Sequence, residues 1–280
     1  MHNLAGATAI ITGASRGLGA AIAHALAKEQ MKLVLAARSA PDLERVAAEL
    51  RPTGREILVF PGDVTSRAAL DALVATAEQT FGSIDVLVNN AGAVTSNPYH
   101  RLSWEEIDRV LQVDFVAPML LTRLVLPGML ARGRGHVVNI ASLAGKVGLG
   151  YQEAYCSSKA GLITFTASLR ASYRGTGVSA SVVCPGFVTS AGMFQRFQEE
   201  TRIAAPPLFG VSSPGQVARA VVDAIKHDSP EILVSPRPIR PMLVLQALFP
   251  GLSERILRRI GGDIFIRAAG RAETTPPTDG

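Results

Sequence analysis

The stretch Thr8-Ala-Ile-Ile-Thr-Gly-Ala-Ser-Arg-Gly-Leu-Gly19 decides the fold. Its first residues, Thr8 to Ile11, are apolar or β-branched, which is typical of a short buried strand. Three glycines follow, at positions 13, 17 and 19. The next residues, from Ala20 to Lys28, form an alanine-rich stretch that favours a helix. The chain therefore starts with a strand, a glycine turn and a helix.

This order gives the glycines a specific use. Gly13 permits a tight turn, while Gly17 and Gly19 allow close backbone approach to a pyrophosphate and close packing of the helix on the strand. The helix N-terminus supplies free N–H groups and a partial positive charge for an anion. A glycine cluster alone would equally be a plain turn, but the flanking strand and helix predict a dinucleotide site.

The rest of the chain alternates strand-like and helix-like segments, which favours a parallel doubly wound sheet. We expect strands near 8–12, 32–36, 57–61, 86–89, 136–140, 179–184 and 231–234. We expect helices near 17–29, 41–50, 66–81, 104–130, 151–173 and 215–226. The predicted fold class is α/β: a single Rossmann-type sheet of about seven strands, flanked by helices, with ligands at the carboxyl ends of the strands.

A second informative stretch is Tyr155-Cys-Ser-Ser-Lys159, with Ser142 thirteen residues upstream. Residues four apart share a helix face, so the Lys159 ammonium can lie beside the Tyr155 phenol. A nearby cation lowers the pKa of a tyrosine and makes it a usable general acid or base near neutral pH. A tyrosine and a lysine at this spacing also occur on ordinary solvated helices, so the other motifs decide.

Four motifs together resemble the classical short-chain dehydrogenase/reductase family, over roughly residues 5–235. The family's glycine motif matches Thr12, Gly13, Gly17 and Gly19, and its Asn-Asn-Ala-Gly motif matches Asn89, Asn90, Ala91 and Gly92. Its catalytic serine, tyrosine and lysine match Ser142, Tyr155 and Lys159. Its Pro-Gly turn matches Pro185 and Gly186, with Thr189 following.

The resemblance implies an oxidoreductase that interconverts a ketone and a secondary alcohol by hydride transfer with a nicotinamide cofactor. It implies that Tyr155 is the acid/base, that Ser142 polarises the carbonyl, and that Lys159 lowers the Tyr155 pKa and binds the nicotinamide ribose. No metal is implied. The expected cofactor-binding residues are Gly13, Ser15, Arg16, Gly17, Leu18, Gly19, Arg38, Asp63, Val64, Asn90, Ala91, Gly92, Tyr155, Lys159, Pro185, Gly186, Val188 and Thr189.

NADP(H) is the expected cofactor, with NAD(H) as the alternative. An acid about 20 residues after the glycine turn would bond the ribose 2′-hydroxyl and repel a 2′-phosphate. The second strand instead ends with Ala36-Ala37-Arg38. Arg38 and Arg16 can pair with that phosphate, and both would otherwise be solvated surface arginines.

Three positions of the family pattern have a second interpretation. Asp63-Val64 matches an adenine-contacting position, but it could belong to a helix start that Thr65 or Ser66 caps. Asn89 could equally be a strand-end packing residue. Asp114 stands where the family often has an asparagine that helps to hold a proton-relay water. An ionised Asp cannot donate a hydrogen bond, so its part in catalysis stays open.

The substrate is expected to be hydrophobic: steroid-like, acyl or aromatic. This rests on apolar residues after Ser142 and in the loop after Gly186, namely Leu143, Val147, Leu149, Met193, Phe194, Phe197, Ile203, Leu208 and Phe209. These residues could instead pack the loop onto the body. The alternative enzyme is a 3-oxoacyl-thioester reductase, which needs a basic patch near the pocket mouth. The alternative of another class is a non-catalytic NADP(H)-sensing protein, which the intact Ser142, Tyr155 and Lys159 disfavour.

The chain divides into a catalytic domain (1–235), an amphipathic C-terminal extension (236–270) and a disordered tail (271–280). Seven arginines and two acidic residues lie between Arg237 and Arg271, so this segment carries the entire net charge of +5. No nucleic-acid motif accompanies the charge. Apolar and basic residues alternate at helical spacing, which predicts an amphipathic helix at 240–260. We favour the interpretation that it packs within the protein or an oligomer; the alternative is that it lies on an anionic membrane.

Composition also limits the size of the domain and the compartment in which we expect the protein. The chain has 280 residues, enough for one domain with a substantial core, and only two cysteines, Cys156 and Cys184. We expect free thiols in a reducing cytoplasm. No signal peptide is expected, and no uninterrupted run of about 18 apolar residues predicts a membrane-spanning helix. The resemblance implies a homodimer or homotetramer that pairs through the long helices at 104–130 and 151–173.

Overall fold

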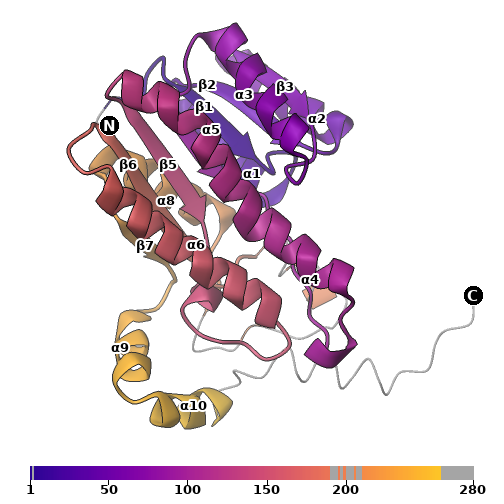
Figure 1. Ribbon diagram of the computed structural model, residues 1–280, viewed down its shortest axis with the longest axis vertical. Coiled ribbons are helices and arrows are strands. Elements are labelled where there is room, and N and C mark those ends of the chain that lie inside the picture. Colours follow the sequence, from indigo (N-terminus) through magenta and orange to yellow (C-terminus); the bar gives the residue numbers. More distant parts are fainter. Residues whose placement is uncertain (2, 190–194, 196–197, 200–204, 206–209, 260–280) are drawn as a thin grey trace, which may run out of the picture.

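The computed structural model contains one seven-stranded, fully parallel sheet (Figure 1). It describes all residues except 2, 190–194, 196–197, 200–204, 206–209 and 260–280. The strands are β1 (Thr8–Thr12), β2 (Lys32–Ala37), β3 (Ile57–Pro61), β4 (Val86–Asn89), β5 (Gly135–Ile140), β6 (Val178–Pro185) and β7 (Glu231–Val234). Their order in the sheet, β3-β2-β1-β4-β5-β6-β7, reverses direction at β1 and confirms the doubly wound fold.

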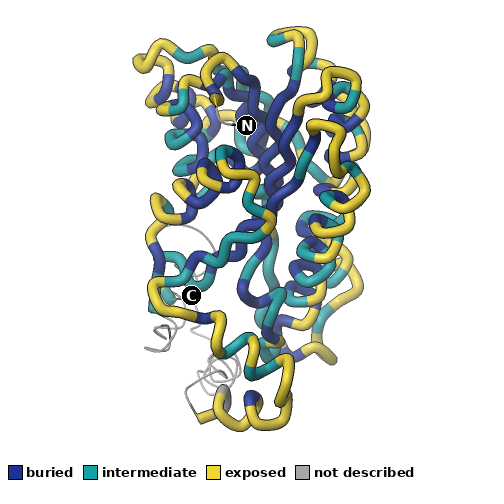
Figure 2. Tube along the Cα trace, turned by 90° about the vertical axis from the view of Figure 1, so that its left-hand side faces the viewer, coloured by how far each residue is buried: buried dark blue, intermediate teal, exposed yellow. Residues whose placement is uncertain are grey.

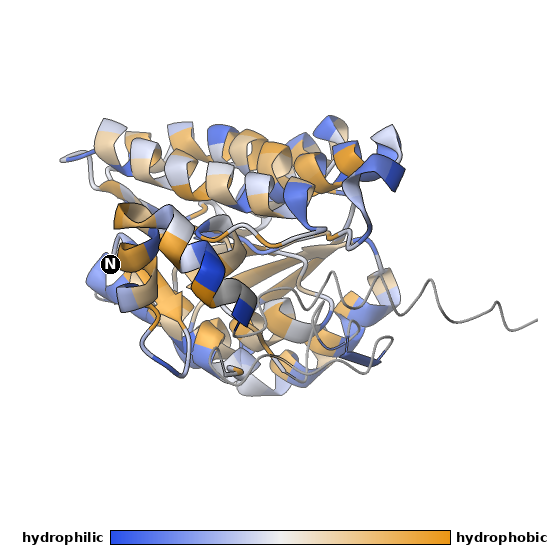
Figure 3. Cartoon of the chain, turned by 90° about the horizontal axis from the view of Figure 1, so that it is seen from below, coloured by the Kyte–Doolittle hydropathy of each residue, from blue (hydrophilic) through white to orange (hydrophobic). Residues whose placement is uncertain are grey.

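Helices connect the strands and cover both faces of the sheet (Figure 3). They are α1 (Gly17–Lys28), α2 (Ala40–Leu50), α3 (Arg67–Phe81), α4 (Trp104–Leu111), α5 (Ala117–Ala131), α6 (Glu153–Ser172), α8 (Pro214–His227), α9 (Arg240–Leu248) and α10 (Pro250–Arg259). The predicted elements are therefore present, and their ends move by one or two residues.

Two hydrophobic cores form because successive strand residues point to opposite faces. Ile11 packs with α1, α2 and α8, whereas its neighbour Ile10 packs with α3, α5 and α6. Figure 2 shows the result: the central strands are buried and the outer sides of the helices are exposed. The loops that carry the predicted site residues therefore extend from a sheet that is packed on both sides.

The predicted helix at 104–130 contains an irregularity that its periodicity did not reveal. Residues Gln112–Val116 form one π-helical turn between α4 and α5, and Asp114 lies in that turn. Such bulges are rare and occur frequently at functional sites. The continuous stretch Trp104–Ala131 is also long and apolar enough to cross a membrane by length and composition. However, it packs on α3, α6, β4 and β5, so it covers one face of the sheet as the connecting helices of this fold do.

The C-terminal extension is helical as far as the structure describes it. Ile239, just before α9, is buried beside Ala141 and Cys184, and Met242 and Leu243 pack on the same cluster. The extension is therefore anchored to the domain near the carboxyl end of β5. The tail at 271–280 and the expected lid residues Met193, Phe194, Phe197, Ile203, Leu208 and Phe209 lie outside the described residues.

Candidate active site

The predicted site residues gather at one edge of the sheet, where β1, β4, β5 and β6 end. The glycine turn follows β1, Asn90 to Gly92 follow β4, Ser142 follows β5, and Pro185 and Gly186 end β6. Parallel strands bring these loops together even though they are far apart in sequence. This is the edge at which doubly wound folds bind their ligands.

The glycine turn needs glycine at two of its positions. Gly13 has φ +67°, and a Cβ there would lie 2.9 Å from the Ala91 Cα. A Cβ on Gly19 would lie 2.1 Å from the Gly13 carbonyl oxygen. Asn90 Nδ2 donates to the Thr12 carbonyl at 2.9 Å, and the Asn90 N–H donates to Thr12 Oγ1 at 3.0 Å. The turn is therefore pressed against the end of β4, and Asn90 fastens the two.

The start of α1 offers its N–H groups to a ligand. Ser39, Ser66, Ser103 and Ser213 cap α2, α3, α4 and α8 with their side chains. By contrast, Arg16 gives α1 no side-chain cap, and its first turn holds no acidic residue. Free N–H groups at a helix start bind anions, so Gly17, Leu18 and Gly19 fit the pyrophosphate of a dinucleotide.

Two exposed arginines flank this helix start. Arg16 precedes α1, and Arg38 follows β2, the neighbouring strand. Arg45 from α2 donates to the Ser15 carbonyl at 3.2 Å and so fixes the loop between them. The arrangement places two positive charges beside the uncapped start of α1.

Asp63 and Val64 lie after β3, as expected. The Asp63 Oδ1 accepts bonds from the Thr65 N–H and hydroxyl, each at 2.9 Å, and Ser66 caps α3. Asp63 therefore shapes this turn, whereas Ser66 supplies the cap that the sequence left between Thr65 and Ser66. Asn89 is buried and donates to Asn139 Oδ1 at 2.8 Å, which supports its packing role.

Ser142 and Tyr155 lie near one another. Ser142 leaves β5 in an extended conformation; its Oγ accepts the Ala144 N–H at 3.1 Å and donates to the Pro185 carbonyl at 3.5 Å. Tyr155 lies in the first turn of α6 with its side chain buried, close enough to the Ser142 side chain for that hydroxyl to affect the Tyr155 pKa. Two neighbouring hydroxyls can bind a single carbonyl or alcohol oxygen between them.

Lys159 is also buried on α6, one turn after Tyr155. Its Nζ donates to the Ile140 carbonyl at 3.2 Å and lies 5.7 Å from the centre of the Tyr155 ring. We expected a lowered pKa for Tyr155, but its pKa in this structure is raised. Burial raises the pKa of Tyr155, and the nearby Asp114 charge raises it further, while the Ser142 hydroxyl acts in the opposite direction.

Asp114 is the charged partner of Lys159. Its Oδ2 lies 3.6 Å from Lys159 Nζ, an ion pair just beyond hydrogen-bond length, and its Oδ1 accepts the Ala93 N–H at 2.7 Å. Burial raises the pKa of Asp114 to about 6, while Lys159 and the Ala93 N–H hold it from rising further. The Lys159 charge is therefore shared between a carboxylate and the Ile140 carbonyl.

The turn after β6 closes the site from the other side. The Gly186 N–H donates to the Val234 carbonyl at 3.0 Å, and a Cβ on Gly186 would lie 3.2 Å from a methyl of Leu143. Val188 pairs with Ser212, and the Thr189 N–H donates to the Ser212 carbonyl at 3.0 Å. Leu143 and Val147 are buried in the body, which favours packing over substrate contact for these two.

Sequence reasoning missed the backbone groups of the site. The Ala93 N–H and the Ile140 carbonyl hold Asp114 and Lys159, but a backbone group leaves no mark in the choice of residue. Gln152, which precedes α6 and donates to Ser96 Oγ at 3.0 Å, was also missed. Its place three residues before Tyr155 was the available signal.

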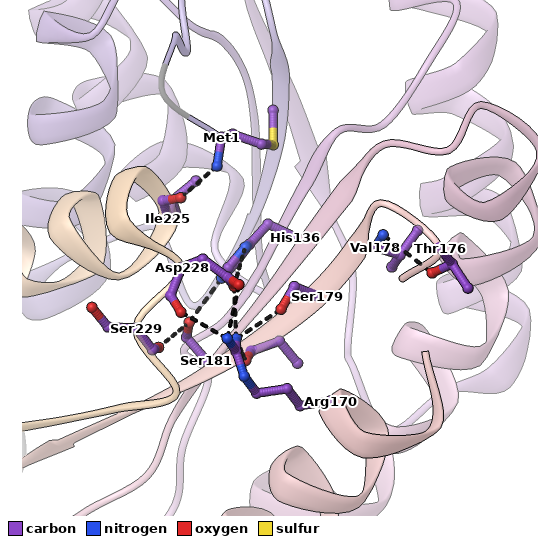
Figure 4. A network of polar contacts seen from close by, with 11 residues as sticks. Met1, His136, Arg170, Thr176, Val178, Ser179, Ser181, Ile225, Asp228 and Ser229 are labelled. Atoms are coloured by element: carbon purple, nitrogen blue, oxygen red, sulfur yellow. Dashed lines mark hydrogen bonds and ion pairs between the residues drawn. The ribbon is translucent and has the colours of Figure 1, made fainter. Parts of the chain in front are cut away.

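A second polar cluster lies at the amino end of β5 and β6 (Figure 4). The Ser181 hydroxyl donates to the Ser229 carbonyl at 2.5 Å, so His136 Nε2–H must be the donor to Ser181 Oγ at 2.8 Å. Arg170 binds both Asp228 carboxylate oxygens, at 2.6 and 2.8 Å. Burial lowers the pKa of His136 to about 4, so it is neutral, and because its Nε2 carries the proton it cannot accept one from Ser181. The cluster is structural.

Comparison with known proteins gives a consistent result. The family model for short chain dehydrogenase matches residues 7–202. The ketoacyl reductase HetN of Nostoc sp. is 44% identical over 266 residues, which cover 93% of this chain and 91% of that protein.

Two solved structures share the fold. A variant of the actinorhodin polyketide ketoreductase with NADPH has a TM-score of 0.73 and 31% identity, covering 82% of this chain and 95% of that chain. A metagenomic short-chain oxidoreductase in complex with NADP has a TM-score of 0.72 and 33% identity, covering 84% and 100%. Family model, relative and structures agree: the chain belongs to the short-chain dehydrogenase family of oxidoreductases.

Proposed function

We propose that the chain is an NADP(H)-dependent oxidoreductase that interconverts a ketone and a secondary alcohol on a hydrophobic substrate. The observation that carries this proposal is that the Ser142 and Tyr155 side chains lie near one another and near the buried Lys159, at the same edge of the sheet as a glycine turn with an uncapped helix start. A binding protein would not need the two hydroxyls and a buried lysine at the same edge.

Each catalytic residue has a separate task. The Ser142 hydroxyl donates to the substrate oxygen and polarises a carbonyl. Tyr155 gives its proton to that oxygen during reduction and takes it back during oxidation; its raised pKa keeps it protonated, as reduction requires. Lys159, one helical turn after Tyr155, would bind the nicotinamide ribose hydroxyls. The cofactor supplies the hydride, and the protein supplies orientation and electrostatics.

The arginines favour NADP(H). Arg16 and Arg38 are exposed on either side of the α1 start, and no acid follows β2. A guanidinium binds a phosphate through two parallel hydrogen bonds, whereas a ribose 2′-hydroxyl would gain little from it. Both structural neighbours named above hold the phosphorylated cofactor, which agrees with this choice.

A second substrate class belongs to the same proposal. The relative from Nostoc sp. is named as a ketoacyl reductase, and one structural neighbour is a polyketide ketoreductase, so a 3-oxoacyl thioester is the second candidate. Exposed arginines on α9 and its approach, Arg237 and Arg240, could meet the phosphate of an acyl carrier. Acyl and other apolar ketones therefore belong in the same substrate panel.

The test is NADPH oxidation by the purified protein across ketones graded from small and polar to large and apolar, including a 3-oxoacyl thioester. Tyr155→Phe should retain NADPH binding and lose at least 99% of turnover, about 3 kcal/mol of transition-state stabilisation. Tyr173→Phe, at the far end of the same helix, is the matched control and should keep full activity. Tight NADPH binding without turnover of any substrate would favour the sensing protein instead.

We also propose that chains associate into a homodimer or homotetramer through α4–α5 and α6. Trp104 at the start of α4 is 84% exposed and Met119 on α5 is exposed as well, which fits a surface that a partner covers.

Free Cys156 and Cys184 agree with the cytoplasm as the compartment.

A further inference from the structure

The extension exposes an unusual amount of apolar surface. Eight large apolar side chains are exposed among the described residues, and five of them lie on α9 and α10 or the residue between them. These are Val244, Leu248, Phe249, Leu252 and Ile256; Leu248 is 66% exposed and Phe249 57%. Contiguous exposed apolar residues on one element mark an interaction surface.

These five residues are exposed although the inner side of α9 packs on the hydrophobic core of the domain. Met242 and Leu243 on α9 pack on the cluster beside Leu143, so the inner side of α9 is already anchored. On α10 the polar Ser253 is only 1% exposed and its hydroxyl has no hydrogen-bond partner, while Leu252 and Ile256 beside it are exposed. A helix pair that buries a serine and exposes leucine and isoleucine is built to meet an apolar phase on its outer side.

The charge of the same surface indicates which apolar phase. Arg237, Arg240, Arg255 and Arg259 are exposed, and Glu254 is the only acid between residues 235 and 259. Apolar and strongly hydrophilic residues lie side by side on these helices (Figure 3). A second copy of this chain would bring arginines against arginines, which opposes pairing. An anionic surface would attract them.

We propose that α9 and α10 dock this protein on the surface of an anionic lipid bilayer. The exposed apolar side chains enter the boundary between headgroups and acyl chains, and the arginines bind lipid phosphates. Because α9 is anchored beside Leu143, the residue after Ser142, docking holds the carboxyl edge of the sheet near the bilayer. An apolar substrate dissolved in lipid would then reach the site without crossing water. Figure 1 shows both helices projecting beyond the end of the sheet.

The experiment is co-sedimentation of the full chain with phosphatidylcholine vesicles, with and without phosphatidylglycerol. We expect binding to the anionic vesicles only, and its loss near 1 M salt, where the Debye length is about 3 Å. Arg255→Gln with Arg259→Gln should weaken the partition coefficient about 30-fold, at roughly fivefold for each arginine. Leu248→Ser with Phe249→Ser should weaken it about 10- to 100-fold.

Matched variants separate the surface from general effects. Arg67→Gln with Arg219→Gln removes two exposed arginines from α3 and α8, and Tyr99→Ser removes an exposed aromatic side chain that lies outside α4, α5 and α6. Both should bind vesicles like the wild type. All variants should bind NADPH with wild-type affinity, which shows that the domain is folded.

Three results would overturn the proposal. The first is the absence of binding to anionic vesicles at low salt. The second is binding that the arginine pair and the Leu248–Phe249 pair leave unchanged. The third is a concentration-dependent oligomer that only Leu248→Ser with Phe249→Ser disrupts, which would assign the surface to a second copy. Binding of a purified acidic acyl-carrier protein in place of vesicles would assign it to that partner instead.

Discussion

Replacement of Asp114 by asparagine tests the most distinctive feature of the catalytic edge. The carboxyl is fully buried, with Lys159 as its counter-charge, and its pKa is about 6 against an ordinary value of 3.8. A carboxyl whose pKa is raised by folding binds its proton more readily in the folded chain. Its contribution therefore favours the folded state increasingly as pH falls through 6, the reverse of an acid stabilised by a salt bridge.

The size of the effect follows from the two pKa values. Between about pH 7.5 and about pH 5, proton uptake by Asp114 stabilises the wild type by roughly 1 kcal/mol, or about 2 °C in Tm for a chain of this length. Asparagine cannot take up that proton.

The assay is thermal unfolding of wild type and Asp114→Asn in one buffer series, with the two Tm values subtracted at each pH. On acidification, we expect the Tm of the wild type to rise relative to the Tm of Asp114→Asn by about 2 °C or more. A second readout is the pH profile of alcohol oxidation: without the Asp114 charge the Tyr155 pKa should fall, so oxidation should begin at lower pH. A pH-independent Tm difference together with an unshifted profile would refute the ion-pair reasoning.

Three further predictions concern other parts of the chain. The pKa of His136 in the folded chain lies near 4, so the unfolded chain takes up the proton first and the free energy of unfolding falls by about 2 kcal/mol between about pH 7.5 and about pH 5. His136→Gln should abolish this loss, which urea unfolding at each pH measures. Gly19→Ala should destroy NADPH binding, since its Cβ would meet the Gly13 carbonyl oxygen at 2.1 Å, while Gly251→Ala, with nothing within 4 Å, should bind normally; fluorescence titration compares them. Arg38→Asp should lower kcat/KM with NADPH roughly 10- to 100-fold and leave or improve that with NADH, and equal losses with both cofactors would contradict the 2′-phosphate assignment.

Most of the fold could be predicted because its signals are local. The apolar runs of β1, β3, β4 and β6 end at or just before glycine, proline or asparagine, and Ser39, Ser66 and Ser213 precede helices as capping residues. The glycine motif could also be placed, because tight turns and close approach restrict the residue type at Gly13 and Gly19. Because the carboxyl ends of parallel strands share one edge of the sheet, the order of the motifs along the chain then predicts that their loops lie together there.

The electrostatics of the site could not be predicted in the same way. The i, i+4 spacing of Tyr155 and Lys159 is real, but it does not say which oxygen holds the ammonium. The decision is made by Asp114, 45 positions before Lys159, through a π-helical turn that helical periodicity does not signal. Burial of a whole cluster, and hence the raised pKa of Tyr155, is likewise a tertiary property.

The two buried titratable groups have opposite consequences at opposite edges of the sheet. Asp114 gains a proton on folding in mild acid and His136 resists one, so their effects on stability oppose each other between about pH 7.5 and about pH 5. The wild-type stability curve should therefore be shallow, although each group alone is worth roughly 1 to 2 kcal/mol. Only the single variants reveal the two contributions. The curves should diverge in opposite directions for Asp114→Asn and His136→Gln, and the double variant should return close to the shallow wild-type slope.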